Sequence, residues 1–437
     1  MVSSENPVKG EKALHTNISN HNIFTRTLHS LTKHYNTVLI MAISFLAFIA
    51  FIWLSYELWR LIVEPDFLFN RPVKMGGIDL KHRMQEVTGW FKSVPIYEND
   101  KDAIYPPASY MIFLPLFGWG TLNITKVVWI LSALVSIVFL IPVLIRESGA
   151  KGYEKIFIAM IPLAIYPTGA TIGNGQISIH IIFFLFTGIC LLFKRDKSLL
   201  CEITGCVFFL IALSKPSISV PFFWIILFAH KSLRPSFLII TGYVFLTFSA
   251  ASFQNAGIIE LCMQWLMAGS AIAEGNGESN IHYFLSFSDL SKYNLHASLL
   301  LLALNGAWVI MNRRSGIILL IGGTAIFARF WTYHAWYDDL LILLPLIALF
   351  KIAKESDKNI RVRIFSIGLF TINLILLIAP GGLYLLPSPL NILCTLVQTV
   401  MWIAILLFLF FSGYSKFNNI AISGKPAALN LAETSVK

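Results

Sequence analysis

The stretch ITKVVWILSALVSIVFLIPVLI, residues 124–145, holds a single charged side chain and is followed directly by Arg146. A helix of this length measures about 33 Å, enough to cross a hydrocarbon core of about 30 Å. Comparable apolar runs recur along the chain. They cover residues 37–63, 107–122, 124–145, 156–173, 177–193, 199–214, 217–229, 236–253, 295–311, 315–333, 339–353, 364–380 and 389–413. The pattern predicts an all-α polytopic membrane protein.

The composition excludes the main soluble classes. Of the 437 residues, 56% are hydrophobic and only 13% are charged, whereas an average soluble chain is about 25% charged. So few charges leave too little polar surface to coat a soluble globule of this size. A soluble enzyme, a disordered chain and a disulfide scaffold are excluded, and we expect one membrane domain without a separate soluble catalytic domain.

The basic residues give the expected orientation. They cluster in short connections at Lys194-Arg195-Asp196-Lys197, Lys231 to Arg234, Arg313-Arg314 and Lys351 to Arg363. By the positive-inside rule these connections face the cytoplasm. Together with the basic N-terminal tail and the connection from Arg146 to Lys155, they can all face the cytoplasm only if the run 107–122 does not cross. We therefore expect this proline-containing run to be re-entrant or interfacial.

This threading predicts about twelve membrane spans with both termini in the cytoplasm. It places 22 of the 33 Lys and Arg residues inside, and two long connections, 64–105 and 254–294, on the outer face of the cytoplasmic membrane. The predicted divisions are a cytoplasmic tail 1–35, a transmembrane catalytic domain 36–414 and a cytoplasmic tail 415–437. The net charge of +10 is then explained by the basic residues that mark the cytoplasmic side. We therefore expect membrane lipids, and no nucleic acid, as partners.

The first outer connection contains the clearest candidate for chemistry. Asp79 follows Gly76-Gly77-Ile78, and the apolar residues after it recur with helical spacing, which predicts an amphipathic helix over 80–92 at the membrane surface. One interpretation is structural: Asp79 caps the helix and pairs with Arg83 one turn later. The other is that Asp79 is a general base, which takes a proton from an incoming hydroxyl at the boundary between water and lipid.

Other polar segments at this face admit a structural or a substrate-binding role. Pro95-Ile96-Tyr97 and Tyr105-Pro106-Pro107 are rigid, because proline fixes its own φ and holds the preceding residue extended. Gly173-Asn174-Gly175-Gln176 is explained first as a glycine-rich turn between two spans, although its amides suit sugar hydroxyls. Asn276 belongs to a turn-rich polar loop in the second outer connection.

Two cations stand where they are disfavoured. Lys215 ends a predicted span at its outer side, directly before Pro216, so it either snorkels to the surface or binds a lipid phosphate. Arg329 lies inside the run 315–333, and an intramembrane arginine indicates a functional site. The segment that follows contains Trp331, Tyr333, His334, Trp336, Tyr337, Asp338 and Asp339. An interfacial aromatic belt explains the rings, but it does not require so many ionisable groups close together.

Six motifs, in their order along the chain, resemble glycosyltransferase family 87. They are Asp79, Pro95-Ile96-Tyr97, Tyr105-Pro106-Pro107, Gly175-Gln176, Lys215-Pro216 and His334-Ala335-Trp336-Tyr337-Asp338-Asp339-Leu340-Leu341. The resemblance covers about residues 75–350. It implies a GT-C-like fold and a transferase that takes its sugar from a polyprenyl phosphate.

The resemblance also implies roles for individual residues. Asp79 would be the catalytic base of a reaction that inverts the anomeric carbon, and His334 would orient that base or contact the donor. The donor phosphate would be held by Lys215, Arg329 and Arg83, because a phosphate leaving group needs cationic stabilisation. The candidates for substrate binding are Tyr97, Tyr105, Asn174, Gln176, Asn276, Tyr337 and Asp338. Which of Asp338 and Asp339 is the family's residue stays open.

The expected function is transfer of a hexose, with mannose favoured, from a polyprenyl-phosphate sugar to a glycan or glycolipid acceptor outside the cytoplasmic membrane. No nucleotide-binding glycine loop is present in the sequence, and we expect neither a metal nor a cofactor. Two alternatives stay open at this point. One is a multi-span transporter or flippase that uses the same charges as a binding site. The other is a polymerase or ligase of lipid-linked glycans.

Overall fold

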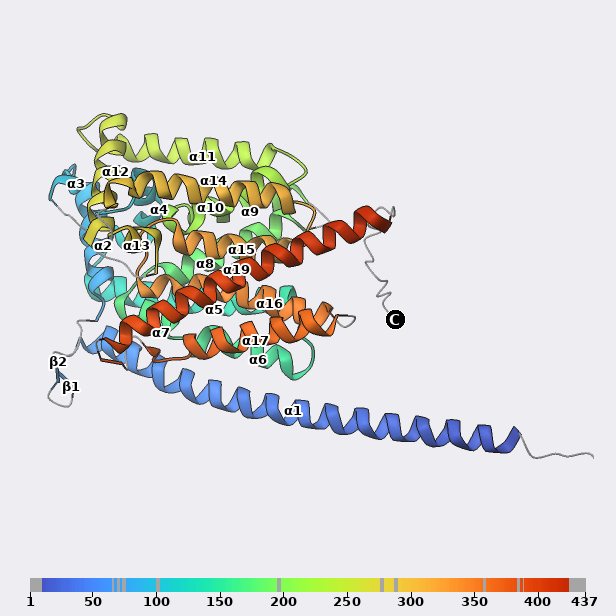
Figure 1. Cartoon of the computed structure of the whole chain (residues 1–437). Coiled ribbons are helices and arrows are strands. Elements are labelled where there is room, and N and C mark those ends of the chain that lie inside the picture. The colour runs from blue at the N-terminus through green and yellow to red at the C-terminus, as the bar shows by residue number, and fades with distance from the viewer. Residues whose placement is uncertain are drawn as a thin grey trace, which may run out of the picture.

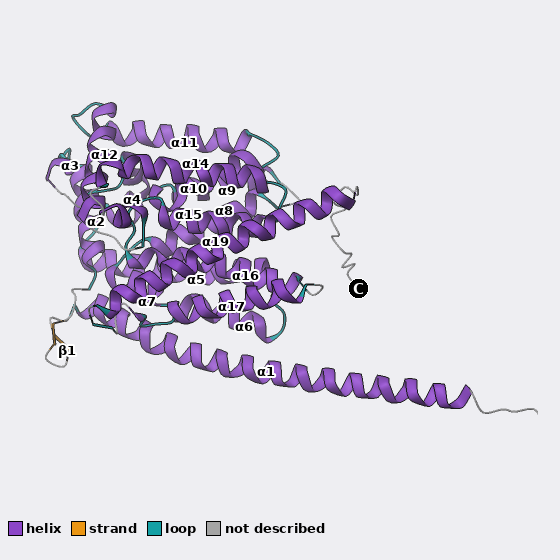
Figure 2. Cartoon of the chain, in the orientation of Figure 1, coloured by secondary structure: helices purple, strands orange, loops and turns teal. Residues whose placement is uncertain are grey.

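The computed structural model describes residues 10–64, 67–68, 71–72, 76–99, 103–194, 198–275, 279–286, 290–356, 359–382, 386–387 and 389–423. Helices dominate this part of the chain (Figure 2). Its only sheet is a small antiparallel pair, β1 (Phe67–Leu68) and β2 (Arg71–Pro72). The prediction of an all-α polytopic membrane protein is therefore confirmed.

The helices form a bundle in which consecutive long helices run in opposite directions (Figure 1). In the first half they are α1 (Gly10–Val63), α2 (Ile78–Trp90), α3 (Ile96–Asn99), α4 (Pro107–Phe117), α5 (Leu122–Ser148), α6 (Tyr153–Ala164), α7 (Tyr166–Asn174), α8 (Ser178–Leu192), α9 (Leu199–Ala212) and α10 (Pro216–Ala229). In the second half they are α11 (Arg234–Ala251), α12 (Ile258–Gly275), α13 (Ile281–Ser286), η1 (Ser291–Tyr293), α14 (Asn294–Asn312), α15 (Ile317–Phe330), η2 (Trp336–Ile342), α16 (Leu343–Glu355), α17 (Ile360–Leu377) and α19 (Leu390–Ser423).

Length and apolar composition qualify six of the described helices as membrane spans: His34–Val63 of α1, α5, α11, Ser291–Asn312, α17 and Leu390–Phe411 of α19. Shorter apolar helices lie between them, among them α8, α9, α10 and α15. The helix α4 has 11 residues and measures about 16 Å, half the hydrocarbon thickness. This length fits the expectation that the run 107–122 does not cross. The count of twelve spans and the division into domains stay predictions.

The bundle has two different ends. Figure 1 shows α2, α3, α12 and α13 together at one end, on the left, with the start of the long helix α1 and the end of α19 toward the other. At the second end, Glu154 accepts a hydrogen bond of 3.0 Å from Tyr35 and is paired with Lys354. At the first end, Gln176 meets Tyr337 and Lys215 meets Asp338. The polar segments that the sequence placed outside therefore gather at one end of the bundle.

The predicted span 156–173 is broken in two, which the hydropathy did not anticipate. Helix α6 ends at Ala164, Ile165 is extended, and α7 begins at Tyr166 with a proline at its second position. The carbonyl oxygen of Ala164 accepts a hydrogen bond of 2.9 Å from the backbone N–H of Ala379. Irregular backbone at membrane depth is tolerated where protein surrounds it and satisfies its polar groups, and here the segment after α17 does so.

Three glycines allow the close packing at the start of α2. Gly77 adopts φ 66° before the helix, and its N–H donates a hydrogen bond of 2.8 Å to the carbonyl of Gly173. A Cβ on Gly76 would lie 1.9 Å from the carbonyl oxygen of Arg60, and a Cβ on Gly175 would lie 2.5 Å from the Cβ of Leu80. The ends of α1, α2 and α7 therefore meet through glycine backbone.

The predicted helix in the first outer connection forms, but its apolar side does not face lipid. Leu80, Val87 and Trp90 are fully buried in the protein, and the Trp90 indole donates a hydrogen bond of 2.9 Å to the carbonyl of Ala250. The apolar spacing correctly predicted a helix, but its apolar face packs against protein rather than against the membrane surface. Helix α2 is consequently a fixed part of the bundle end.

Replacing Gly76 by alanine tests this docking. The new Cβ meets backbone rather than a flexible side chain, so we expect G76A to be destabilised by about 1–3 kcal/mol. Its thermal inactivation temperature in lipid nanodiscs should fall below that of the wild type. The matched control is G368A in α17, where a Cβ meets nothing within 4 Å and alanine is the better helix former. Equal stability of the two variants would contradict the close approach at Gly76.

Candidate active site

Asp79 lies at the second position of α2, with one residue between it and the glycines that dock this helix. Its carboxylate is hydrogen-bonded to the Gln176 side chain, and the Gln176 amide donates to the Tyr337 hydroxyl at 3.1 Å. Burial raises the pKa of Asp79 above its ordinary value, while the hydrogen bond from Gln176 and the positive charges of Arg83 and Lys215 act in the opposite direction. The side chain keeps part of its exposure. Asp79 is therefore an accessible carboxylate with enhanced basicity.

The structure does not support the interpretation in which Asp79 only caps α2 and pairs with Arg83. Gly77 precedes the helix, and no side chain caps it. Arg83 forms its ion pair with Glu86 rather than with Asp79, and its guanidinium lies 3.8 Å from the centroid of the Tyr105 ring. Arg83 pairs with Glu86, three positions later, because both side chains turn into the protein, where each is less than 9% exposed.

Lys215 points into the protein and does not snorkel. The residue precedes α10, whose first position is Pro216, and it is only 6% exposed. Its Nζ lies 2.5 Å from Oδ1 of Asp338 and 3.2 Å from Oγ of Ser178. The same ammonium is 5.0 Å from the centroid of the Tyr337 ring. The α8, α10 and η2 segments thus converge on this one cation.

Asp338 is shared between two basic side chains. Oδ1 accepts from Lys215 and, at 2.6 Å, from Ser178, while Oδ2 lies 3.0 Å from Nδ1 of His334. Burial alone would raise the pKa of Asp338, but Lys215 and His334 hold that pKa well below its usual range. Asp338 is therefore a permanent carboxylate that fixes the position of the Lys215 ammonium.

His334 is fully buried. Its second ring nitrogen, Nε2, lies 2.7 Å from the carbonyl oxygen of Ala328. Both ring nitrogens are therefore taken by the protein, one by Ala328 and the other by Asp338. The predicted catalytic role of His334 is untested, and this geometry favours positioning of Asp338 over contact with the base.

The neighbouring aspartate, Asp339, belongs to a second buried cluster. Asp339 accepts a hydrogen bond of 2.5 Å from Nε of Arg329 and is also bonded to the Tyr166 hydroxyl. The Arg329 guanidinium lies 5.2 Å from the Trp402 ring, and the Gln398 amide reaches the Tyr166 hydroxyl at 3.4 Å. The two adjacent aspartates therefore belong to different sites, Asp338 to Lys215 and Asp339 to Arg329.

We call the residues joined to Asp79 and Lys215 the Asp79–Lys215 network. Its members are Asp79, Gln176, Tyr337, Lys215, Ser178, Asp338 and His334. Five of the predicted site residues have their described contacts elsewhere. Arg329 is in the second cluster, Arg83 and Tyr105 contact each other, Asn174 accepts a hydrogen bond of 2.8 Å from Arg60, and the Tyr97 hydroxyl donates to the Tyr105 carbonyl at 2.6 Å. The predicted residue Asn276 lies outside the described residues.

Three residues of these two clusters and of the neighbouring helix end were not predicted from the sequence. Ser178 was overlooked although it follows Gln176 by two positions, and Tyr166 because the break in its helix was not recognised. Arg60 was not singled out, yet Glu57 stands three residues before it near the end of a candidate span, a spacing that indicates an ion pair. Among the described residues, no group of three or more His, Cys, Asp or Glu side chains is arranged to hold a metal ion.

The arrangement separates two chemical capacities. At one side a partly exposed carboxylate of raised pKa can accept a proton. At the other, a buried ammonium held by Asp338 can stabilise a developing negative charge. These are the groups that a displacement reaction with an anionic leaving group needs.

A double substitution tests how the charges of Lys215 and Asp338 contribute to stability and to activity. Asp338→Asn leaves a buried cation short of its counter-charge, so we expect a loss of stability of about 3–5 kcal/mol. Lys215→Met combined with Asp338→Asn removes both charges, keeps a hydrogen-bonding side chain beside Ser178 and His334, and should recover most of that stability without recovering activity. Thermal inactivation in nanodiscs and turnover are measured for all variants. A double variant as unstable as D338N would contradict a mainly electrostatic pairing.

The comparison with known proteins points to one family. Residues 103–352, more than half of the chain, match the model of glycosyltransferase family 87. The matched region contains Lys215, Arg329 and Asp338, whereas Asp79 and the rest of α2 precede it. No curated protein and no solved structure matches the chain. With its set of apolar helices, the chain thus belongs to glycosyltransferase family 87 and is a membrane glycosyltransferase.

Proposed function

We propose that the chain transfers a hexose, with mannose favoured, from a polyprenyl phosphate to a glycan or glycolipid acceptor at the outer face of the cytoplasmic membrane. The observation that carries this proposal is the Asp79–Lys215 network, in which Gln176 and Tyr337 join a basic carboxylate to a buried cation. The network lies at the bundle end that carries the long connections. The distribution of Lys and Arg supports the outer face for this end and the cytoplasm for both termini.

The proposed step is an inverting displacement. The acceptor hydroxyl loses its proton to the Asp79 carboxylate while its oxygen bonds to the anomeric carbon of the donor. The bond from that carbon to the phosphate oxygen breaks, and its electron pair leaves with the lipid phosphate. The oxygen and the leaving group lie on opposite faces of the carbon, which requires inversion.

Lys215 is the proposed contact for the departing phosphate. An ammonium has three N–H donors, and the described contacts of Lys215 use two, to Ser178 and Asp338. The third is available for a phosphate oxygen, whose negative charge grows as the bond breaks. Arg83 and Arg329 are each paired with a carboxylate outside the Asp79–Lys215 network, so we assign neither of them a direct contact with the phosphate.

The substitution Asp79→Asn tests the assignment of the base. It keeps the size of the side chain and removes its basicity, so we expect turnover to fall about 10²–10⁴-fold. Transfer from radiolabelled polyprenyl-phosphate mannose is measured in nanodiscs, with binding of the donor as a second readout. Binding should be retained, because an amide of the same size at this position does not disturb Lys215.

The matched control is Gln85→Ala, an exposed position on the same helix, which should keep wild-type turnover. A D79N variant with wild-type turnover would refute the base assignment. Transfer by the wild type from a lipid-diphosphate oligosaccharide, and not from the monophosphate sugar, would instead identify a polymerase or ligase.

The pH dependence provides an independent test. Asp79 must be ionised to act as a base, so kcat/KM falls as the pH drops through its pKa. Because that pKa is raised, the acid limb should lie above the ordinary aspartate value of about 3.9. Gln176→Leu removes a hydrogen bond that favours the ionised form, so it should move the limb to still higher pH. An acid limb that Q176L leaves in place would contradict the role of Asp79.

A further inference from the structure

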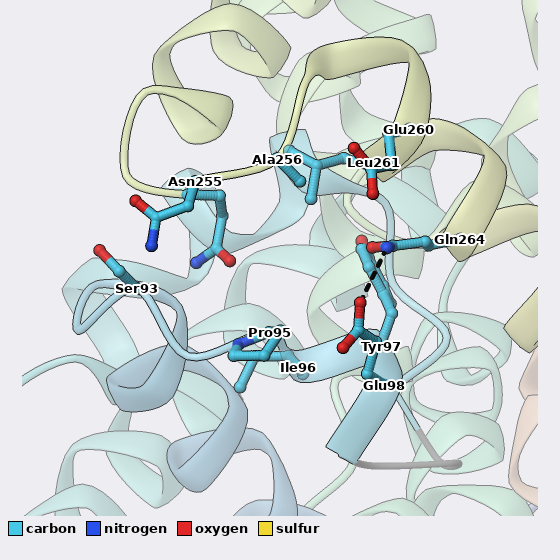
Figure 3. Close-up of a pocket in the computed structure, with 11 residues that line it drawn as sticks. Ser93, Pro95, Ile96, Tyr97, Glu98, Asn255, Ala256, Glu260, Leu261 and Gln264 are labelled. Atoms are coloured by element: carbon cyan, nitrogen blue, oxygen red, sulfur yellow. Dashed lines mark hydrogen bonds between the residues drawn. The ribbon is translucent and has the colours of Figure 1, made fainter.

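A second polar site lies at the same end of the bundle, away from the Asp79–Lys215 network. It is a cavity of about 280 Å³ between the segment after α2 and the beginning of α12 (Figure 3). Its lining residues come from both long outer connections. They are Ser93, Pro95, Ile96, Tyr97, Glu98, Gln254, Asn255, Ala256, Glu260, Leu261 and Gln264.

The two walls of the cavity are joined by hydrogen bonds. The Gln264 amide donates to Oε1 of Glu98 at 3.2 Å, the dashed line in Figure 3. The Ser93 hydroxyl donates to the carbonyl of Phe253 at 2.9 Å, and the Gln254 amide donates to the carbonyl of Trp90 at 2.6 Å. The cavity is therefore a built feature of the fold, held by both connections.

The lining suits a neutral polyol. Side-chain amides of Gln254, Asn255 and Gln264 and the carboxylates of Glu98 and Glu260 supply donors and acceptors for hydroxyl groups. Ile96 and Leu261, both buried, and the Tyr97 ring give an apolar surface for the C–H face of a sugar. The lining includes two carboxylates and no lysine or arginine, which disfavours a phosphate or another anion. This cavity is therefore unsuited to the donor phosphate.

The helix α12 gives the site a lipid-facing border. Glu260 and Gln264 on this helix line the cavity, whereas Ile259, Met263 and Met267, also spaced by four residues, are 79%, 54% and 68% exposed. An amphipathic helix with such a face lies in the membrane interface. A ligand whose sugars occupy the cavity would therefore have its lipid tail next to the bilayer.

The cavity is separated from Asp79 by the length of α2. Trp90 lies eleven positions after Asp79 along the helix, about 16 Å at the usual rise, and the Trp90 ring meets the Tyr97 ring edge-on with 5.8 Å between the ring centroids. We propose that the cavity binds the inner sugars of a glycolipid acceptor whose terminal hydroxyl reaches Asp79. This proposal rests on the proposed function and adds the acceptor class to it.

Two single variants test the site, Gln264→Ala and Glu260→Ala, with Gln85→Ala as an exposed control on α2. The protein is reconstituted in nanodiscs with radiolabelled polyprenyl-phosphate mannose as donor. The acceptor probes, offered in parallel, are the total lipid extract and the water-soluble glycan fraction of the cells in which the chain naturally occurs. We expect label in a product that partitions into organic solvent, and an acceptor KM raised about five- to tenfold in Q264A and E260A.

The KM for the donor and the rate of donor hydrolysis by water should stay unchanged in both variants, which a general structural defect would not allow. An unchanged acceptor KM would overturn the proposal. So would wild-type label that enters only a water-soluble glycan, because the acceptor would then have no lipid anchor. Absence of any transfer or donor hydrolysis by the wild type would overturn the proposed function itself, and the inference with it.

Discussion

The buried ion pair between Lys215 and Asp338 is the constraint on which the rest of this bundle end depends. An unpaired ammonium in a low-dielectric environment costs several kcal/mol, so the carboxylate must be brought to it from 123 positions along the chain. Ser178 shares the pair from a third helix. Once Asp338 is fixed, its neighbour Tyr337 lies against Gln176, and Gln176 in turn reaches Asp79. One electrostatic requirement thus orders residues from four segments.

Much of this was predictable because hydrophobicity and proline act locally. The run 217–229 corresponds to α10, which begins at Pro216 and ends at Ala229. The misplaced charges of Lys215 and Arg329 were also apparent, since each breaks a topological rule. Their partners were not, because two adjacent aspartates look equivalent in sequence and only the turn of η2 sends them to different cations. The break at Ile165 was hidden for a similar reason, since the carbonyl that it frees is satisfied by a segment more than two hundred residues away.

The helix α2 connects the two sites at this end. Its first turn presents Asp79 to Gln176, and the segment after its last turn forms one wall of the polar cavity. The buried residues between them pack on protein, so the helix has little freedom to tilt. In the proposed reaction, the distance between the reacting hydroxyl and the bound sugars would be set by this rigid element rather than by a mobile loop.

The contacts of the last third of the chain bear on how the protein is divided. The family match ends at residue 352, yet the N–H of Ala379 satisfies the broken helix, and Trp402 and Gln398 complete the cluster around Arg329 and Tyr166. A chain that stopped where the family match stops would open the membrane interior at two polar points. The C-terminal helices therefore complete the packing and the hydrogen bonding of the matched part, and the two parts form one structural unit.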